Sequence, residues 1–472
     1  MSNIRHRKVW PLFLLAVICL ALAQPILASG SRPGRSLEGG CREEEPPLAA
    51  GRARPALLRG VRPPLGPPAE AVGSISANAG GPERRTDAPR AAGDESWASV
   101  ADGVNDTVFA VATSGTDLYV GGQFQEMTDD KGTTEVDFIA KWDGDAWQSL
   151  EDGVNERVWA ITPSESGMYV GGWFTQATDE KGVHTVNRIV RWTGGGWAPV
   201  GGGVDGGVTS IAINGNDVYV GGFFTHAIND DGGKVVVNNI AKWDGQAWSA
   251  LGEGLTGESN GYVAVTSIAV NGTDVYVGGA FTAATDASGA KTVNNIARWD
   301  GSRWSALGGG TNDYVYAIAP HGTDVYVGGQ FTTVSDAIGT TQAKGIARWT
   351  GSAWRQVGDG LTFGIAPGRV YALRASANGL FVGGDFTEAL DGAGVQDANF
   401  VARWDGAAWH TMGEGVNSSV MALAIRGTTL YTGGAFTEAG AKEAKCVARF
   451  RPARLAGDFG LYLSYIAAGI GK

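Results

Sequence analysis

Short apolar segments recur along the second part of the chain, each followed by a turn signal. In one representative stretch, β-branched and aromatic residues fill Val265–Val270 and Asp274–Phe281, with Asn271-Gly272 between them. Two further runs, Asn295–Trp299 and Arg303–Leu307, flank an Asp-Gly pair. Such residues favour strands, and Asn-Gly or Asp-Gly pairs favour tight hairpin turns. The pattern predicts four short antiparallel strands, with a loop of about a dozen residues between the second and third.

This four-strand pattern repeats seven times and is marked by a Gly-Gly-x-Phe motif at the end of the second strand. The steps between motifs are 50, 50, 57, 50, 55 and 50 residues. The seven copies are Gly121–Phe124, Gly171–Phe174, Gly221–Phe224, Gly278–Phe281, Gly328–Phe331, Gly383–Phe386 and Gly433–Phe436. Four antiparallel strands at this period are typical of a propeller blade, and stacking in a closed ring supplies each blade with a core. We therefore expect an all-β, seven-bladed β-propeller.

Two tryptophans, five residues apart, follow each motif in the first six units. The first closes the third strand and the second opens the fourth; the pairs are Trp142/Trp147, Trp192/Trp197, Trp243/Trp248, Trp299/Trp304, Trp349/Trp354 and Trp404/Trp409. The seventh unit has Phe450 at the first position and lacks the second. Trp97–Val100 has the pattern of a fourth strand but precedes the first unit. We expect this N-terminal strand to complete the last blade and leave no open edge.

These motifs resemble those of the kelch family. Kelch units carry apolar residues before a Gly-Gly pair, then an aromatic on the third strand and a Trp at the start of the fourth. The resemblance covers about residues 96–450, where VYVGG, IARWDG and W..LG fill those places. A third-strand Trp in place of the usual Tyr, and the Phe after the glycines, depart from the family pattern. The variant is similar to repeats in secreted bacterial proteins, which implies the architecture but not an adaptor function.

The two ends of the chain differ from the repeats. Residues 1–23 combine a basic start, an apolar run from Val9 and a small-x-small site at Ala21-Leu22-Ala23, which is typical of a secretory signal peptide. A retained membrane anchor is the alternative. We interpret residues 24–94, rich in Pro, Arg and Gly, as a disordered linker, 95–452 as the propeller, and 453–472 as a short apolar tail. We expect a secreted or cell-surface protein without a membrane span after signal removal.

Composition narrows the possible partners. The formal charge is −11, which argues against nucleic acid held through phosphate contacts. Glycine accounts for 74 of 472 residues, but the glycines come in pairs without the three-residue period of collagen. Signal removal leaves only Cys41 and Cys446, from which we expect no disulfide framework. We expect a monomer.

Residues suited to catalysis are sparse. Four histidines follow the signal, at different places in the repeat: His184, His226, His321 and His410. No paired-His or paired-Cys metal motif is present, and the converging His, Tyr and Cys ligands of a galactose-oxidase-like copper site are not apparent. Acidic residues recur in the loops between second and third strands. We interpret them as turn formers rather than calcium ligands, because calcium needs six to eight oxygens. We expect no metal and no cofactor.

One position in each first strand varies against a constant background. Its occupants are Phe109, Trp159, Thr209, Thr266, Tyr316, Tyr371 and Met421. First strands line the central channel of a propeller, so aromatics here could stack on a sugar or clamp a peptide; packing between blades is the alternative. Two insertions, Thr256–Tyr262 and Thr362–Arg369, lengthen connections on what we expect to be the same face. The candidate ligand-binding residues are Phe109, Trp159, Tyr316, Tyr371, Tyr262 and Arg369.

The sequence thus predicts a secreted, non-catalytic binding module. It recognises an extracellular protein or glycan through one face of the propeller. A carbohydrate-active enzyme, either a lyase or a galactose-oxidase-like oxidase, is the alternative. An enzyme needs several ionisable residues converging in one pocket, whereas a binding module needs only an aromatic or loop-rich patch.

Overall fold

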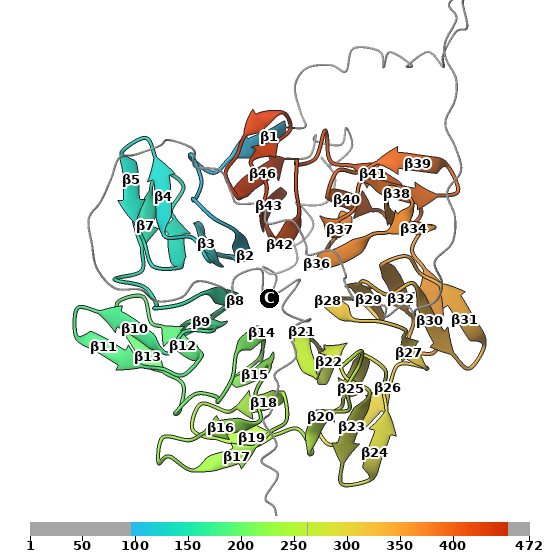
Figure 1. The fold of residues 1–472 in the computed structure, drawn as a ribbon, viewed down its shortest axis with the longest axis horizontal. Coiled ribbons are helices and arrows are strands. Elements are labelled where there is room, and N and C mark those ends of the chain that lie inside the picture. Colours follow the sequence, from blue (N-terminus) through green and yellow to red (C-terminus); the bar gives the residue numbers. More distant parts are fainter. Residues whose placement is uncertain (1–95, 262, 452–472) are drawn as a thin grey trace, which may run out of the picture.

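The structure, a computed structural model, describes residues 96–261 and 263–451. They form seven four-stranded antiparallel sheets, and Figure 1 shows them arranged as blades around a central axis. The protein is an all-β, seven-bladed β-propeller, as the repeats predict. The signal peptide, the linker and the apolar tail lie outside the described residues. Within the described part of the chain, no helix has the length and apolarity that a membrane crossing needs.

Every blade uses the same strand order from the channel outward. The innermost strands are β2 (Val108–Ser114), β8 (Val158–Ser164), β14 (Val208–Asn214), β21 (Ala264–Asn271), β28 (Val315–His321), β36 (Arg369–Ser376) and β42 (Val420–Arg426). The second strands, which end in the Gly-Gly pair, are β3 (Asp117–Gly122), β9 (Gly167–Gly172), β15 (Asp217–Gly222), β22 (Asp274–Ala280), β29 (Asp324–Gly329), β37 (Gly379–Asp385) and β43 (Thr429–Gly434).

The outer half of each blade carries the aromatic pair. The third strands are β6 (Ile139–Trp142), β12 (Ile189–Trp192), β18 (Ile240–Trp243), β25 (Ile296–Trp299), β32 (Ile346–Trp349), β40 (Val401–Trp404) and β46 (Val447–Arg451). The outermost strands are β7 (Trp147–Ser149), β13 (Trp197–Pro199), β19 (Trp248–Ala250), β26 (Trp304–Ala306), β33 (Trp354–Gln356), β41 (Trp409–Thr411) and β1 (Ser96–Ser99). In the six Trp–Trp pairs the ring centroids lie 4.8 to 5.4 Å apart.

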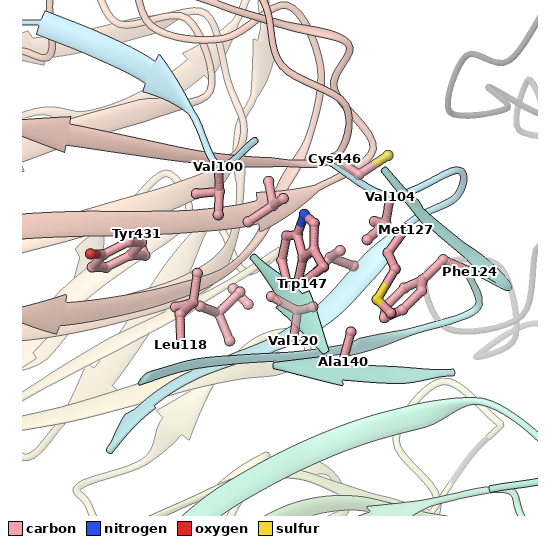
Figure 2. Packing of buried hydrophobic residues seen from close by; sticks show 14 of the residues in the cluster. Val100, Val104, Leu118, Val120, Phe124, Met127, Ala140, Trp147, Tyr431 and Cys446 are labelled. Carbon is pink, nitrogen blue, oxygen red and sulfur yellow. The ribbon is translucent and has the colours of Figure 1, made fainter. Parts of the chain in front are cut away.

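The ring closes through β1, as predicted. β1 pairs antiparallel with β46, so that Trp97 lies opposite Phe450. Their rings are 5.1 Å apart, and they replace the Trp–Trp pair of the other blades. Figure 2 shows the buried cluster at this junction, where Val100 and Tyr431 of the seventh blade approach Trp147 of the first. An N-terminal segment therefore completes the last blade.

One element was not predicted. Where a loop was expected between the second and third strands, every blade forms an additional hairpin: β4 (Glu126–Asp129) with β5 (Gly132–Glu135), β10 (Gln176–Asp179) with β11 (Gly182–Thr185), β16 (His226–Ile228) with β17 (Lys234–Val236), β23 (Ala283–Asp286) with β24 (Gly289–Thr292), β30 (Thr333–Asp336) with β31 (Gly339–Gln342), β38 (Glu388–Asp391) with β39 (Gly394–Asp397), and β44 (Glu438–Ala439) with β45 (Lys442–Glu443). These strands are short and mostly polar, so they lack the apolar alternation by which the main strands are recognised.

The connections that precede three of the innermost strands add further strands to these hairpins. They are β20 (Gly254–Thr256), which pairs with β23; β27 (Gly310–Thr311), which pairs with β30; and β34 (Gly360–Phe363), which pairs with β38 and with β35 (Ala366–Pro367). Both insertions therefore lie on the same face as the hairpins, as the sequence predicts.

The acidic turns have a structural role. Asp179 accepts the backbone N–H of Lys181 with Oδ1 and that of Trp197 with Oδ2, each at 2.9 Å. Asp286 and Asp391 do the same for Trp304 and Trp409. The hydrogen bond from His184, together with these backbone donors, lowers the pKa of Asp179 to about 2. The interpretation of these residues as turn formers is confirmed.

Cys446 does not follow the sequence expectation. It precedes β46 and is fully buried in the cluster of Figure 2. It is disulfide-bonded, a single bond that the expectation of no disulfide framework did not anticipate.

Candidate functional site

The variable position of each innermost strand is a β-bulge. In the first blade, Val108 pairs with Gly122 and Ala110 with Gly121, which leaves Phe109 as the extra residue. The same shift recurs in every blade, and the bulged residues are Phe109, Trp159, Thr209, Thr266, Tyr316, Tyr371 and Met421. All seven are half-buried. A bulge redirects the side chain of its extra residue, so the fold sets seven side chains apart from ordinary strand packing.

The constant glycines make this bulge possible. A Cβ on Gly122 would lie 2.1 Å from the carbonyl oxygen of Thr107, which accepts the N–H of Gln123 where the chain crosses the bulge. A Cβ on Gly121 would lie 2.4 Å from Cγ1 of Val158 in the next blade. One glycine therefore permits the bulge and the other permits close blade-to-blade contact.

The innermost strands surround a channel with a volume of about 760 Å³. Five bulge residues line it: Phe109, Trp159, Thr209, Tyr316 and Tyr371. They lie where the innermost strands begin, on the face that also carries the additional hairpins and both insertions. We call this face, made of the bulge residues, their neighbours in the Gly-Gly-x-Phe motifs and the two insertions, the mouth face.

The bulge aromatics form two groups at the mouth face. Phe109 and Trp159 stack with centroids 4.5 Å apart and an interplanar angle of 5°. Tyr316 and Tyr371 lie 5.5 Å apart in a tilted arrangement. Thr209 differs, because its hydroxyl donates to the carbonyl of Val265 in the next blade at 2.5 Å. The alternative of packing between blades therefore describes Thr209, whereas the aromatic pairs combine packing with partial exposure.

The two tyrosines belong to a polar network that includes Arg369. The hydroxyl of Tyr316 donates to Gln330 Oε1 at 2.6 Å, and that of Tyr371 donates to Asp385 Oδ2 at 3.3 Å. Burial and the neighbouring Asp385 raise the pKa of Tyr371, and burial raises that of Tyr316. Burial opposes the charge on Arg369, but the tyrosines and Asp385 outweigh it and raise its pKa. Both hydroxyls are therefore protonated donors at neutral pH.

The first insertion is anchored to the mouth face. The hydroxyl of Tyr314 donates to the carbonyl of Ser259 at 3.1 Å. The side-chain amide of Asn260 donates to Asp313 Oδ1 at 3.0 Å. Ser259 is 7% exposed, so this insertion is held against the fifth blade. Tyr262, a candidate from the sequence, lies outside the described residues.

The second insertion presents apolar side chains to solvent. It forms the β34–β35 hairpin, whose turn carries Phe363 at 49% exposure and Ile365 fully exposed. Arg369, at its end, begins β36 two residues before the bulge at Tyr371. A hairpin with two exposed apolar side chains thus immediately precedes the innermost strand of the sixth blade.

Sequence reasoning missed a second variable position on this face. It is the residue between the Gly-Gly pair and the Phe, which is Trp173 in the second blade and Phe223 in the third. Their rings lie 6.4 Å apart, and the guanidinium of Arg188 lies 5.5 Å from the Trp173 ring. Variation at the x of Gly-Gly-x-Phe was the available signal.

The histidines do not converge on the mouth. His184 pairs with Asp179 at 2.8 Å, His226 with Asp205 at 3.1 Å and His410 with Asp405 at 2.6 Å. His321 ends β28, at the first hairpin turn of its blade. Over 96–261 and 263–451, no three His, Cys, Asp or Glu residues gather as a metal site would require.

Comparisons with known proteins give only distant likenesses. No family model matches the chain, and no curated protein sequence is similar to it. Among solved structures, the computationally designed Ika8 protein is 16% identical with a TM-score of 0.40, covering 75% of this chain and 98% of that one. The WD40 β-propeller domain of Doa1 is 11% identical with a TM-score of 0.41, covering 75% and 96%. A chain of the Mitotic Checkpoint Complex is 13% identical with a TM-score of 0.42, covering 79% and 98%.

At these low TM-scores, the likenesses establish neither the fold nor the function of this protein. The fold rests on the strand pairing described above. Seven sheets with one common order and an N-terminal strand that completes the last sheet establish the protein as a β-propeller closed by its own first strand.

Proposed function

We propose that the protein is an interaction module that binds another protein through the mouth face. The main support for this proposal is that the positions that vary between blades lie on the same face. The bulge residues, the x residues and both insertions differ between blades and lie on one face, whereas the glycines, tryptophans and phenylalanines that hold the ring repeat in almost every blade. A scaffold that varies only on one face is typical of recognition.

A protein partner suits this face better than a glycan. Exposed apolar residues such as Phe363 and Ile365 commonly anchor protein contacts, because burying them on binding is favourable. The aromatic rings that could stack on a sugar are partly occupied, since Phe109 and Trp159 cover one face of each other. A glycan ligand remains an outcome that the experiment below distinguishes.

The network around Tyr371 does not favour the lyase alternative. A tyrosine that removes a proton from a sugar needs a lowered pKa. Here burial and Asp385 raise the pKa of Tyr371, so its hydroxyl holds its proton. The two tyrosine hydroxyls of this network donate hydrogen bonds, and Asp385 accepts one of them.

We expect the β34–β35 tip to dominate partner binding. Replacing Phe363 and Ile365 together by serine removes the exposed anchors without opening the core, so the partner Kd rises by roughly tenfold or more. The partner is captured from extracellular fractions of the source organism, and its Kd is measured by calorimetry with the purified pair.

The matched control replaces Val183 and Ile338 by serine. Both are exposed apolar residues of the additional hairpins and belong to neither insertion, so we expect the Kd to be unchanged. If the mature chain instead binds a glycan on an array, and Trp159→Ala abolishes that binding while the hairpin double variant retains it, the protein-partner proposal is wrong.

We further propose a kelch-type variant that acts outside the cell or on its surface. The signal-like residues 1–23 support export. The disulfide at Cys446 agrees with an oxidising compartment.

We expect export to remove the N-terminal segment, so exported protein begins at or after Gln24. The reason is the small-x-small site at Ala21-Leu22-Ala23, behind an apolar run. N-terminal sequencing of exported material checks this. A start near Met1 would contradict processing and favour the membrane anchor.

A further inference from the structure

A single charged side chain lines the channel. Of the described residues that surround the cavity of about 760 Å³, only Arg374 carries a charge at neutral pH. Its neighbours on the wall are mostly small or aliphatic, among them Ala319, Leu373, Ala424 and Ile425. Arg374 is exposed to the channel, so its guanidinium is accessible to a solute that enters it.

The fold does not require an arginine here. Arg374 lies three residues after the bulge, where the other blades have Ala112, Thr162, Ala212, Ala269, Ala319 and Ala424. The Nε of Arg374 donates to the carbonyl of Leu423 in the next blade at 3.3 Å. Thr162 makes the equivalent contact, because its hydroxyl donates to the carbonyl of Ile211 at 2.9 Å. A threonine therefore satisfies the contact between blades, so this contact does not require the guanidinium of Arg374.

No anion among the described residues neutralises this cation. Across residues 96–261 and 263–451, no Asp or Glu forms an ion pair with Arg374. The side chain is exposed to the channel. The protein around it nevertheless displaces part of the water and thereby lowers the pKa of the guanidinium. Arginine nevertheless stays charged at neutral pH. Its terminal N–H groups are thus available for an anion within the channel.

We propose that the channel binds a small molecule through a single carboxylate at Arg374. The planar guanidinium presents paired donors that match a carboxylate. One cation balances one negative charge, and no second cation among the described lining residues balances a phosphate dianion. The channel wall offers both polar and apolar contacts to the body of the ligand. At about 3.3 Å per residue, this site lies roughly 10 Å along the strand from Tyr371 and is separate from the proposed partner surface.

The test compares two probes that differ in charge, 4-bromobenzoate and 4-bromobenzamide, by calorimetry with the full chain. We expect the carboxylate to bind at least tenfold more tightly than the amide. Arg374→Thr keeps the contact with Leu423, as Thr162 does with Ile211, so this variant folds normally and loses the preference. Arg374→Lys keeps a charge and part of the preference, which shows the role of charge even if the threonine variant folds poorly.

Three outcomes would overturn the site. They are equal affinity for the two probes, an unchanged preference in Arg374→Thr, and a bromine anomalous peak away from Arg374 in crystals of the complex. Tighter binding of phenyl phosphate than of the carboxylate would contradict the assignment of a monocarboxylate. Partner binding through Phe363 and Ile365 is expected to be unchanged in Arg374→Thr, so the two proposals fail independently.

Discussion

Replacing Trp97 by alanine is expected to lower the free energy of unfolding by about 3–5 kcal/mol. The side chain is 3% exposed, packs against Phe450 and donates from Nε1 to the carbonyl of Met412 at 2.6 Å. The substitution leaves a cavity and an unpaired buried carbonyl in the one blade assembled from both ends of the described chain. Urea unfolding of the full chain, followed by tryptophan fluorescence, measures the change.

Two truncations serve as controls for this closure. Removal of residues 31–94 leaves β1 intact but deletes Cys41, so both truncated proteins are compared under reducing conditions, where the disulfide at Cys446 does not contribute. Under these conditions we expect the midpoint of unfolding to be unchanged by the first truncation. Removal through Val100 deletes β1 and its ladder with β46, which exposes the edge of the seventh blade. We expect a loss of several kcal/mol, the sum of a buried aromatic and a strand of hydrogen bonds. Equal stability of the two truncated proteins would refute closure by β1.

The first and seventh blades pack against each other as closely as the other neighbouring blades do. The cluster of Figure 2 joins Leu118 and Trp147 of the first blade to Tyr431 and Val447 of the seventh. Gly433 of the seventh blade packs on Val108 of the first, as Gly121 packs on Val158. The junction therefore resembles the other six, and no weak seam separates the two ends of the ring.

The predictable parts of this fold are those whose residues recur at the same position in successive blades. Gly121, Trp142 and Trp147 recur because each blade solves the same packing problem, so their spacing revealed the blade number and the missing strand. The hairpin β10–β11 was not predictable, because Gln176–Asp179 and Gly182–Thr185 have no continuous apolar face and pair through backbone hydrogen bonds.

The site was predictable only in part, for a related reason. Phe109 and Tyr371 were found because they vary where their neighbours repeat. Trp173 was missed because it stands inside an otherwise constant motif, and its contact with Arg188 depends on tertiary geometry. Arg374 occupies a position that is alanine in five other blades, but its isolation becomes visible only once the channel wall is assembled.

The second prediction with a large effect compares the loss of stability at a tryptophan of the outer strands with that at a tryptophan of the mouth face. We expect Trp304→Ala to cost about 3–5 kcal/mol of unfolding free energy, because Trp304 is 1% exposed and donates from Nε1 to the carbonyl of Leu251 in the preceding blade at 2.9 Å. Trp159→Ala removes a half-buried ring stacked on Phe109, and we expect a smaller loss of about 1–2 kcal/mol.

We expect partner binding to be affected more by Trp159→Ala than by Trp304→Ala. The folded fraction of Trp304→Ala keeps its affinity, because the residue lies in the outermost strand β26, far from the channel. Trp159 lies at the mouth face, so Trp159→Ala is expected to weaken partner binding by roughly 1–3 kcal/mol. Thermal and urea unfolding, with Kd from calorimetry below the unfolding transition, measure both quantities on the same proteins. If the two variants lose equal stability and neither changes the Kd, the bulge aromatics are ordinary core, and the variation among the seven bulges reflects packing alone.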